Sequence, residues 1–250
     1  MKMLRFGFTK WSLLIFVLPV VSSCDSSEDG PAPAPTPAVE LPSLREGLLA
    51  LYTFEGNADD QSINSYDGSV SGAKLADDRF GNASSAYQFD GENDYISFGN
   101  IEELSLGGFE PYTFSAWVKV DSVDGRIAIL SKWNGGVSAG WYLAVTENST
   151  IFSYRNVVPW VAESSSKINR NEFVHLATAY DGQDLDIYIN GKLSVSEPFR
   201  SHPHDRSTPF LIGALHSRHQ VDGFFKGVID DIRIYNRALS TEEIQWLADN

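Results

Sequence analysis

The chain has 250 residues, of which 42% are apolar, 12% aromatic and 21% charged, a composition typical of a globular protein and unlike that of disordered or collagen-like chains. Its 33 acidic and 19 basic residues give a formal charge of -14. This charge argues against binding to nucleic acid or to an anionic membrane surface, because both require a cationic protein face. The single cysteine excludes an internal disulfide and a cysteine-cluster zinc site.

Residues 1–23 have the pattern of a secretory signal peptide. Lys2, Arg5 and Lys10 precede an apolar run from Trp11 to Val21, which is too short to cross a bilayer. The residues VSSC that end at Cys24 resemble a bacterial lipobox, in which the cysteine becomes the mature N-terminus and carries a diacylglycerol. The resemblance implies a lipoprotein in which Cys24 anchors the chain to a membrane through lipid alone. A plain signal peptide with a chance cysteine is the alternative.

Residues 24–43 hold the cysteine and a linker. The 19 residues after Cys24 include five prolines and almost no large apolar side chain, so they cannot form a core. Alternating proline and alanine favours an extended polyproline II tether. The acids Asp25, Glu28 and Asp29 look like the export signals of some Gram-negative lipoproteins, which implies an outer membrane lipoprotein exposed on the cell surface.

From residue 44 to residue 250 the sequence predicts short strands. Between Tyr112 and Val120 every second residue is apolar, which places one face of that strand in a core. Similar alternation predicts strands at 127–133, 141–146, 173–180 and 185–189. Asn190-Gly191 then suits a type I′ hairpin turn, and Ser240 to Glu243 forms a capping box that opens a short helix. We therefore predict an all-β, two-sheet antiparallel sandwich with a C-terminal helix.

A family resemblance covers nearly all of this domain. The blocks GLLALYTFEGNADDQSINSYDGSVSGA, DRFGNASSAYQFDGENDYISFG, PYTFSAWVKV, FVHLATAYDGQDLDIYINGK, FLIGA and FFKGVIDDIRIYNRALSTEEI occur in order from about Gly47 to the C-terminus. They resemble the laminin-G-like, concanavalin A-like domain of secreted bacterial proteins. The resemblance implies a jelly roll of two curved antiparallel sheets.

Oxygen-bearing side chains cluster within residues 55–60, near the start of the domain, and two more, Asp230 and Asp231, lie near its end. Glu55, Asn57 and Asp60 belong to the first group, whereas Asp230 belongs to the second. Such hard ligands suit Ca²⁺. The family resemblance implies a structural calcium that joins the first and last strands through Asp60 and Asp230. Alternatively, Asp60 accepts hydrogen bonds in an Asx turn and Asp230 pairs with Arg79 or Arg233.

Catalytic motifs are missing from the sequence. Glycoside hydrolases of this fold use carboxylates that alternate along one strand, and no Glu-x-Asp-x-Glu run occurs here. The neighbouring acids Asp230 and Asp231 would point to opposite faces of a regular strand. We therefore expect a protein that is not an enzyme, with a glycoside hydrolase of unusual site as the remaining possibility.

Aromatic and polar side chains instead favour a binding module. Sugar recognition needs flat aromatic faces with hydrogen-bonding groups nearby. The candidate ligand-binding residues are Trp160, Tyr154, Arg155, Trp133, His204 and His216. The tryptophans on strands could equally pack against the sheets. We expect a carbohydrate ligand, and a cell-surface protein partner is the alternative.

Overall fold

A computed structural model describes residues 40–106, 109–135, 140–155, 161–198, 207–217 and 220–250. Cys24 and the linker up to residue 39 lie outside the described residues, as do Trp160 and His204. The chain from Ala38 to Asn250 forms one compact unit. None of the described helices is both long and apolar enough to cross a membrane.

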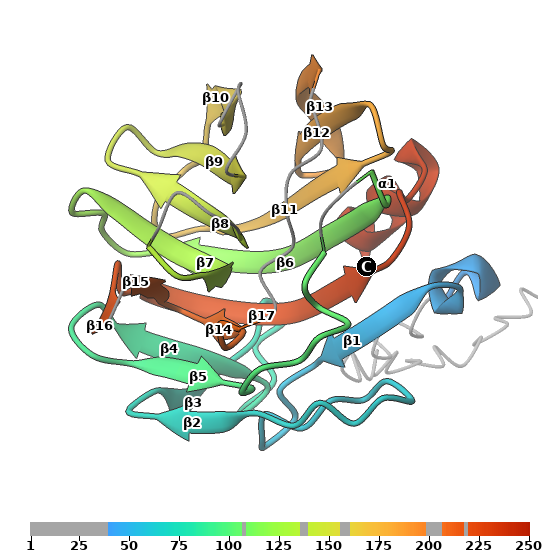
Figure 1. Ribbon diagram of the computed structural model, residues 1–250. Helices are drawn as coiled ribbons and strands as arrows, with labels where there is room; N and C mark the ends of the chain where they lie inside the picture. Colours follow the sequence, from blue (N-terminus) through green and yellow to red (C-terminus); the bar gives the residue numbers. More distant parts are fainter. Residues whose placement is uncertain (1–39, 107–108, 136–139, 156–160, 199–206, 218–219) are drawn as a thin grey trace, which may run out of the picture. The chain divides into compact units, whose positions relative to one another are not determined.

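Two antiparallel sheets form the two layers of a sandwich, as predicted (Figure 1). In the described part of the chain, one sheet has eight strands, in which β1 (Leu48–Tyr52) also pairs with β17. The order of the other strands is β13 (Lys192–Pro198), β12 (Asp184–Ile189), β11 (Phe173–Tyr180), β6 (Tyr112–Val120), β17 (Lys226–Tyr235), β4 (Ala86–Asp90) and β3 (Lys74–Ala76).

The second sheet has seven strands within the described ranges. Its order is β10 (Val161–Lys167), β9 (Thr150–Arg155), β8 (Gly140–Thr146), β7 (Arg126–Trp133), β14 (Leu211–Ile212), β5 (Tyr95–Ser97) and β2 (Ser69–Ser71). A separate hairpin joins β15 (Leu215–Ser217) to β16 (Gln220–Asp222). Strands that are distant in sequence are neighbours in both sheets, so loops from separate parts of the chain meet at the ends of the sandwich.

The core lies between the sheets and follows the predicted alternation. Tyr112, Phe114, Ala116, Val118 and Val120 of β6 are all buried in it. The indole of Trp141 from the opposite sheet stacks on Phe114, with ring centroids 4.1 Å apart. Trp141 is therefore a core residue, which agrees with the alternative that the tryptophans on strands pack against the sheets.

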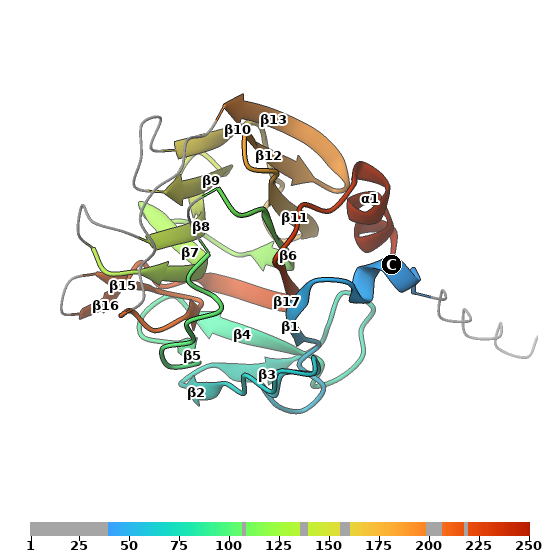
Figure 2. The same ribbon diagram turned by 45° about the vertical axis from the view of Figure 1, so that its right-hand side comes forward.

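The outer faces of both sheets are partly covered. Helix α1 (Thr241–Asp249) packs on the outer side of the sheet that contains β6 and β11 (Figure 2). Its Ile244 and Leu247 are buried against Ala177 and Tyr188. The β15–β16 hairpin covers part of the other sheet, where Leu215 packs with Tyr142. Because helix α1 and the β15–β16 hairpin cover the outer faces of the sheets, several strands are buried on both faces.

Two local predictions about turns and caps are confirmed. Asn190 and Gly191 have φ values of 49° and 74°, the left-handed conformation that a type I′ turn requires at both positions. At the start of α1, the Ser240 hydroxyl accepts a hydrogen bond from the backbone N–H of Glu243, whose side chain in turn accepts one from the Ser240 backbone. Both motifs form from local sequence alone, since their partners are at most three residues apart.

Candidate functional site

One end of the sandwich holds a pocket of about 460 Å³. Three loops build it: the β4–β5 turn, the β6–β7 loop and the β16–β17 loop. Its lining residues are Gly91, Ser122, Asp124, Arg126, Ile127, Gly223, Phe224 and Lys226. The volume lies in the range of small-molecule sites, and the pocket combines an aromatic side chain with hydrogen-bond donors and acceptors.

Backbone hydrogen bonds fix these loops relative to one another. The Asp121 N–H donates to the carbonyl of Lys226 at 3.0 Å, which ties the β6–β7 loop to β17. The Ala128 N–H donates to the carbonyl of Gly223 at 2.8 Å, which ties the β16–β17 loop to β7. Gly223 has a φ of 60°, and a Cβ there would lie only 2.9 Å from the Leu215 side chain. The pocket walls are thus parts of the folded scaffold.

The side chains of the pocket are suited to a polar ligand with an apolar face. Phe224 is half-buried, so part of its ring faces solvent. Arg126 is held by a hydrogen bond from its Nη1 to the Tyr142 hydroxyl at 2.7 Å. Asp124 and Lys226 are exposed. An aromatic ring flanked by guanidinium, ammonium and carboxylate groups can stack on a sugar ring and bond its hydroxyls.

The β4–β5 turn at the edge of this pocket is held by its own acids. The Asp90 carboxylate accepts the backbone N–H of Glu92 at 2.7 Å and that of Asn93 at 3.2 Å. The hydrogen bond from the Glu92 N–H is the main reason that the pKa of Asp90 lies below its usual range. Asp94 closes the turn by accepting the Asp90 N–H at 3.0 Å. These acids therefore shape the turn that carries Gly91.

Two of the predicted sugar-binding side chains, those of Trp133 and His216, are described by the structure and do not line this pocket. Trp133 is half-buried, and its ring centroid lies 5.3 Å from that of Tyr142. His216 is half-buried on β15, where it pairs with Val221 in register. The backbones of Tyr154 and Arg155 lie on β9, opposite Tyr142 and Trp141 of β8.

The pocket residues Asp124, Arg126, Phe224 and Lys226 were not predicted from the sequence. They belong to two segments that are far apart along the chain, and no motif links the two segments. Only the strand order brings them together. The one available signal in the sequence was the pair Phe224-Phe225, since neighbouring side chains of an extended segment face opposite ways. In the structure Phe225 is fully buried, whereas Phe224 is half-buried.

The four predicted calcium ligands do not fit a calcium site. The Asp60 carboxylate accepts the N–H groups of Leu51 at 2.9 Å, Ser62 at 2.8 Å and Tyr66 at 3.0 Å. These donors point at the oxygens that a cation would need. The bond from Ser62 is the Asx turn that was the alternative interpretation. Among the described residues, no group of three or more His, Cys, Asp or Glu could hold a metal ion.

The other expected ligands are also engaged or isolated. The Asn57 amide donates to Asp59 Oδ2 at 2.7 Å, and its oxygen accepts the Asp59 N–H at 3.1 Å. Glu55 is exposed to solvent. Asp230 is buried against Arg79. Cationic and N–H partners thus occupy the carboxylates that were expected to share Ca²⁺.

We therefore expect EDTA to leave the melting temperature of metal-free protein unchanged, because these carboxylates are already satisfied by protein donors. The measurement is a thermal melt with added calcium and with EDTA. A fall in melting temperature on chelation that Asp230→Asn abolishes would restore the calcium interpretation.

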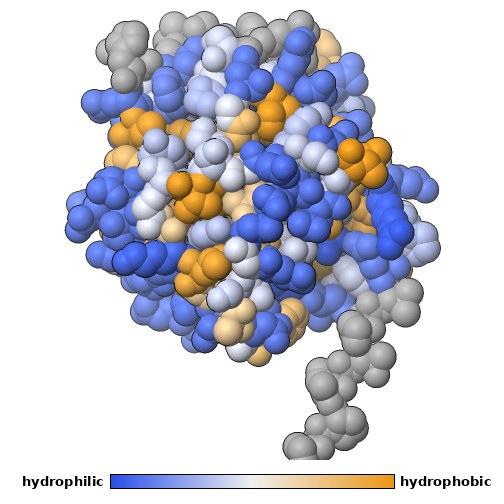
Figure 3. All heavy atoms as spheres, turned by 90° about the horizontal axis from the view of Figure 1, so that it is seen from below, coloured by the Kyte–Doolittle hydropathy of each residue, from blue (hydrophilic) through white to orange (hydrophobic). Residues whose placement is uncertain are grey.

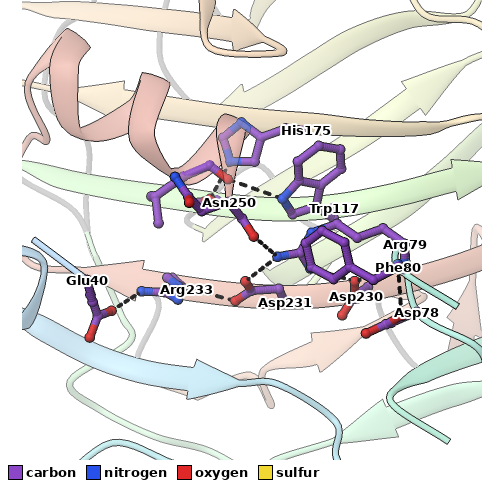
Figure 4. A network of polar contacts seen from close by, with 12 residues as sticks. Glu40, Asp78, Arg79, Phe80, Trp117, His175, Asp230, Asp231, Arg233 and Asn250 are labelled. Carbon is purple, nitrogen blue, oxygen red and sulfur yellow. Dashed lines mark hydrogen bonds and ion pairs between the residues drawn. The ribbon is translucent and has the colours of Figure 1, made fainter. Parts of the chain in front are cut away.

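A buried ion network surrounds Arg79, which lies in the loop between β3 and β4 (Figure 4). Its Nη1 lies 2.7 Å from Asp230 Oδ2, and its Nη2 lies 3.2 Å from Asp231 Oδ2. The same Nη2 donates to the backbone oxygen of Asn250 at 2.8 Å. One guanidinium thus joins β17, the loop after β3 and the end of α1.

The prediction that Asp230 and Asp231 point to opposite faces is wrong. The pairing of β17 with β6 shifts register between Asp230 and Arg233, and Asp231 has a φ of 41°. This bulge turns both carboxylates toward Arg79. Burial raises the pKa of Asp230 to about 6, while the Arg79 guanidinium favours its ionised form. Neither acid is placed to act on a bond in a ligand, since both are paired with arginine.

His175 lies beside this network and is fully buried. Its Nε2 is 2.8 Å from the Ser115 hydroxyl, and its ring centroid is 5.4 Å from that of Trp117. Burial lowers its pKa to about 3, so the imidazole is neutral in the folded protein. His175 is therefore a structural histidine of the folded domain.

Large apolar side chains on the surface are scattered. Figure 3 shows them as separate patches on a largely hydrophilic face. Among the described residues, the exposed large apolar side chains are Ile63, Val70, Leu75, Phe80, Phe109 and Leu193. A broad apolar interface would form one continuous patch instead.

Comparison with known proteins agrees with the architecture. The model of the concanavalin A-like lectin/glucanases superfamily (Laminin_G_3) matches residues 90–245, more than half of the chain. Among curated proteins, the N,N-dimethylformamidase beta subunit of Paracoccus aminophilus is 25% identical over 173 residues. This match covers 58% of the chain, and it spans only 22% of the length of that subunit.

Solved structures with the same fold include several binding domains. Domain 4 of AbnA, a GH43 extracellular arabinanase from Geobacillus stearothermophilus solved with arabinotriose, has a TM-score of 0.64 and 22% identity. The match covers 80% of this chain and 98% of that domain. The binding domain of Paraclostridial Mosquitocidal Protein 1 has a TM-score of 0.65 and 19% identity, with 82% and 52% of the two chains covered. The botulinum neurotoxin serotype D binding domain has a TM-score of 0.62 and 17% identity, with 83% and 51% covered.

Proposed function

Because this chain belongs to the concanavalin A-like lectin/glucanases superfamily, we propose that it is a non-catalytic binding module whose ligand is a carbohydrate. The observation that carries the proposal is the pocket of about 460 Å³, in which Phe224 and Lys226 at the start of β17 meet Arg126 at the start of β7. Structures of the same fold are binding domains, and one of them was solved with arabinotriose. These likenesses support a glycan ligand.

The absence of catalysis is supported by the state of the acids in the described residues. A glycosidase needs two carboxyl groups that flank one glycosidic bond. Asp230 and Asp231 are instead bound to Arg79, and Asp230 is only 2% exposed. In the pocket, Asp124 is the one lining carboxylate of the described chain. A single carboxylate is sufficient to bind hydroxyls, whereas the two-carboxylate mechanism needs a partner.

Presentation on the outer membrane is part of the proposal and rests on the sequence. The VSSC motif at Cys24 would supply the lipid, and the proline-rich linker would hold the domain away from the membrane. Cys24→Ser is therefore expected to release the protein from the membrane fraction of cells. Retention of this variant in membranes, compared with wild type after carbonate washing, would contradict the lipid anchor.

The binding function is tested by a glycan array and by polysaccharide gels. We expect reproducible binding to at least one glycan, and Phe224→Ala to weaken it by at least about tenfold, or about 1.4 kcal/mol, because the sugar loses its stacking surface. Phe109→Ala is the matched control, since Phe109 is exposed and lies outside the pocket. Trp160→Ala tests the aromatic residue that the sequence favoured.

Three outcomes would contradict the proposed function or its assignment to this pocket. Folded protein that binds no glycan would shift the assignment to a protein ligand. Binding that survives Phe224→Ala and disappears in Trp160→Ala would keep the function and move the site. Equal loss in Phe224→Ala and Phe109→Ala would show that the effect is not specific to the pocket.

A further inference from the structure

A second hollow runs along helix α1, away from the candidate sugar pocket. It has a volume of about 430 Å³ and is lined by Leu41, Thr241, Glu242, Gln245, Trp246 and Asp249. The five helical residues extend from the first to the last turn of α1, and Leu41 faces them from the segment before the 3₁₀ helix Pro42–Arg45. We call this hollow the α1 groove.

The floor of the α1 groove is apolar, because Leu41 and Trp246 are half-buried and pack at the edge of the cluster beneath the helix. Its ends are acidic. Glu242 in the first turn and Asp249 in the last turn are both exposed, and none of the described lining residues is basic. The groove therefore offers an apolar floor between two negative charges.

The acid at the helix C-terminus is unusual. The carbonyl end of a helix carries partial negative charge and is normally accompanied by Lys, Arg or His. The last turn of α1 has no basic residue, and Asp249 adds a further negative charge there. The Arg79 guanidinium already donates to the Asn250 backbone oxygen at this helix end, and Asp249 Oδ1 accepts the Gln245 amide at 2.9 Å. A positive group of another molecule would therefore be attracted by the exposed Asp249 carboxylate.

We propose that the α1 groove binds an extended basic segment of a partner protein, with an aliphatic side chain between Leu41 and Trp246 and a Lys or Arg at each acidic end. The charges favour this occupant over a second copy of the chain, because two copies that each carry a formal charge of -14 would repel one another. An anionic membrane would be repelled for the same reason.

The helix geometry sets the spacing of the basic residues. Glu242 and Asp249 are seven residues apart, or about 10 Å along the axis at 1.5 Å per residue. A segment in the polyproline II conformation advances about 3.1 Å per residue with three residues per turn, so two basic side chains three positions apart span this distance on the same edge of the segment. The partner segment would thus carry the pattern basic, aliphatic, any residue, basic.

The test uses three synthetic peptides and ¹⁵N-labelled protein. The probe is acetyl-GSKLPKSG-amide, and the matched peptides are acetyl-GSELPESG-amide, which reverses the charge, and acetyl-GSKSPKSG-amide, which removes the aliphatic side chain. We expect the first to cause saturable shifts of the Trp246 indole and Gln245 amide signals, and the other two to bind at least about tenfold more weakly.

Charge variants separate this site from general attraction to an acidic protein. Glu242→Gln/Asp249→Asn is expected to weaken binding of the first peptide at least about tenfold, whereas Glu55→Gln/Asp77→Asn, which neutralises two exposed acids outside the groove, should leave it unchanged. All four positions are exposed, so both variants should fold, which a thermal melt verifies.

Several results would overturn the proposal. These are no shift of the Trp246 signal with the first peptide, equal affinity for the charge-reversed peptide, or equal binding by both double variants. Sedimentation that shows a dimer, dissociated by Trp246→Ser, would assign the groove to a second copy instead. None of these results bears on glycan binding at the loop-end pocket, since the two sites share no residue.

Discussion

Arg79→Met is expected to lower the free energy of unfolding by about 3 to 5 kcal/mol, because it leaves the buried Asp230 without its cationic partner. The Arg79 side chain is 10% exposed and that of Asp230 is 3% exposed, so water cannot replace the lost contacts. The variant also removes the contacts with Asp231 and with the backbone oxygen of Asn250. Urea denaturation of wild type and variant measures the difference.

The control for this prediction is Arg45→Met. Arg45 also pairs with a carboxylate, with its Nε 3.5 Å from Glu40, yet its side chain is 80% exposed. Exposed pairs contribute about 0 to 1 kcal/mol, so this variant should be close to wild type. Similar losses in the two arginine variants would show that the buried network has no special role. Adding Asp230→Asn to Arg79→Met should recover part of the loss, because no unpaired charge then remains buried.

Acidification from pH 7 to pH 4.5 is expected to cost the protein about 2 to 3 kcal/mol of stability through His175 alone. The folded pKa of about 3 lies below the ordinary histidine pKa of 6.5, so below pH 6.5 the unfolded chain binds a proton that the folded protein does not. The stability from this group is therefore present above pH 6.5 and is lost as the pH falls toward 3. The cause is burial, since charging the imidazole would place a cation in the protein interior.

The measurement compares the pH dependence of unfolding in wild type and His175→Gln. The difference between them isolates the histidine from the charged groups nearby, namely Asp230, Asp231, Arg79 and Arg233. Asp230 acts in the opposite sense, because its raised pKa gives stability at low pH that is lost as the pH rises through about 6. Identical pH slopes in the two proteins would contradict the assignment of the acid sensitivity to His175.

The fold was predictable because its signals are local. Alternation along residues 112–120, the Asn190-Gly191 turn and the Ser240 capping box each depend on neighbouring residues, and all three are present in the structure. The family resemblance added the jelly-roll arrangement, and the superfamily match agrees with it. Burial of Thr113 and Ser115 on the second face of β6 was not predicted, since it depends on contacts with Arg237, Leu239 and His175, which are distant in sequence.

The candidate site was not predictable, because the residues that form it are not neighbours in the sequence. Asp124 and Phe224 are about a hundred positions apart and share a pocket only because β6 and β7 lie next to β17 and β14 in their respective sheets. Asp230 shows a second limit. Its match to a family pattern suggested calcium, whereas a bulge at Asp231 turns both acids toward Arg79. A bulge changes direction without leaving a clear sequence signal.

Titration of arabinotriose, and of the best glycan from the array, into ¹⁵N-labelled protein tests the central claim most directly. We predict saturable shifts confined to the β4–β5 turn, residues 121–127 and residues 222–226, with at least about tenfold weaker binding in Phe224→Ala and none of that loss in Phe109→Ala. Saturable shifts elsewhere on the domain, or no shift with any glycan at millimolar concentration, would contradict the assignment of this pocket to carbohydrate.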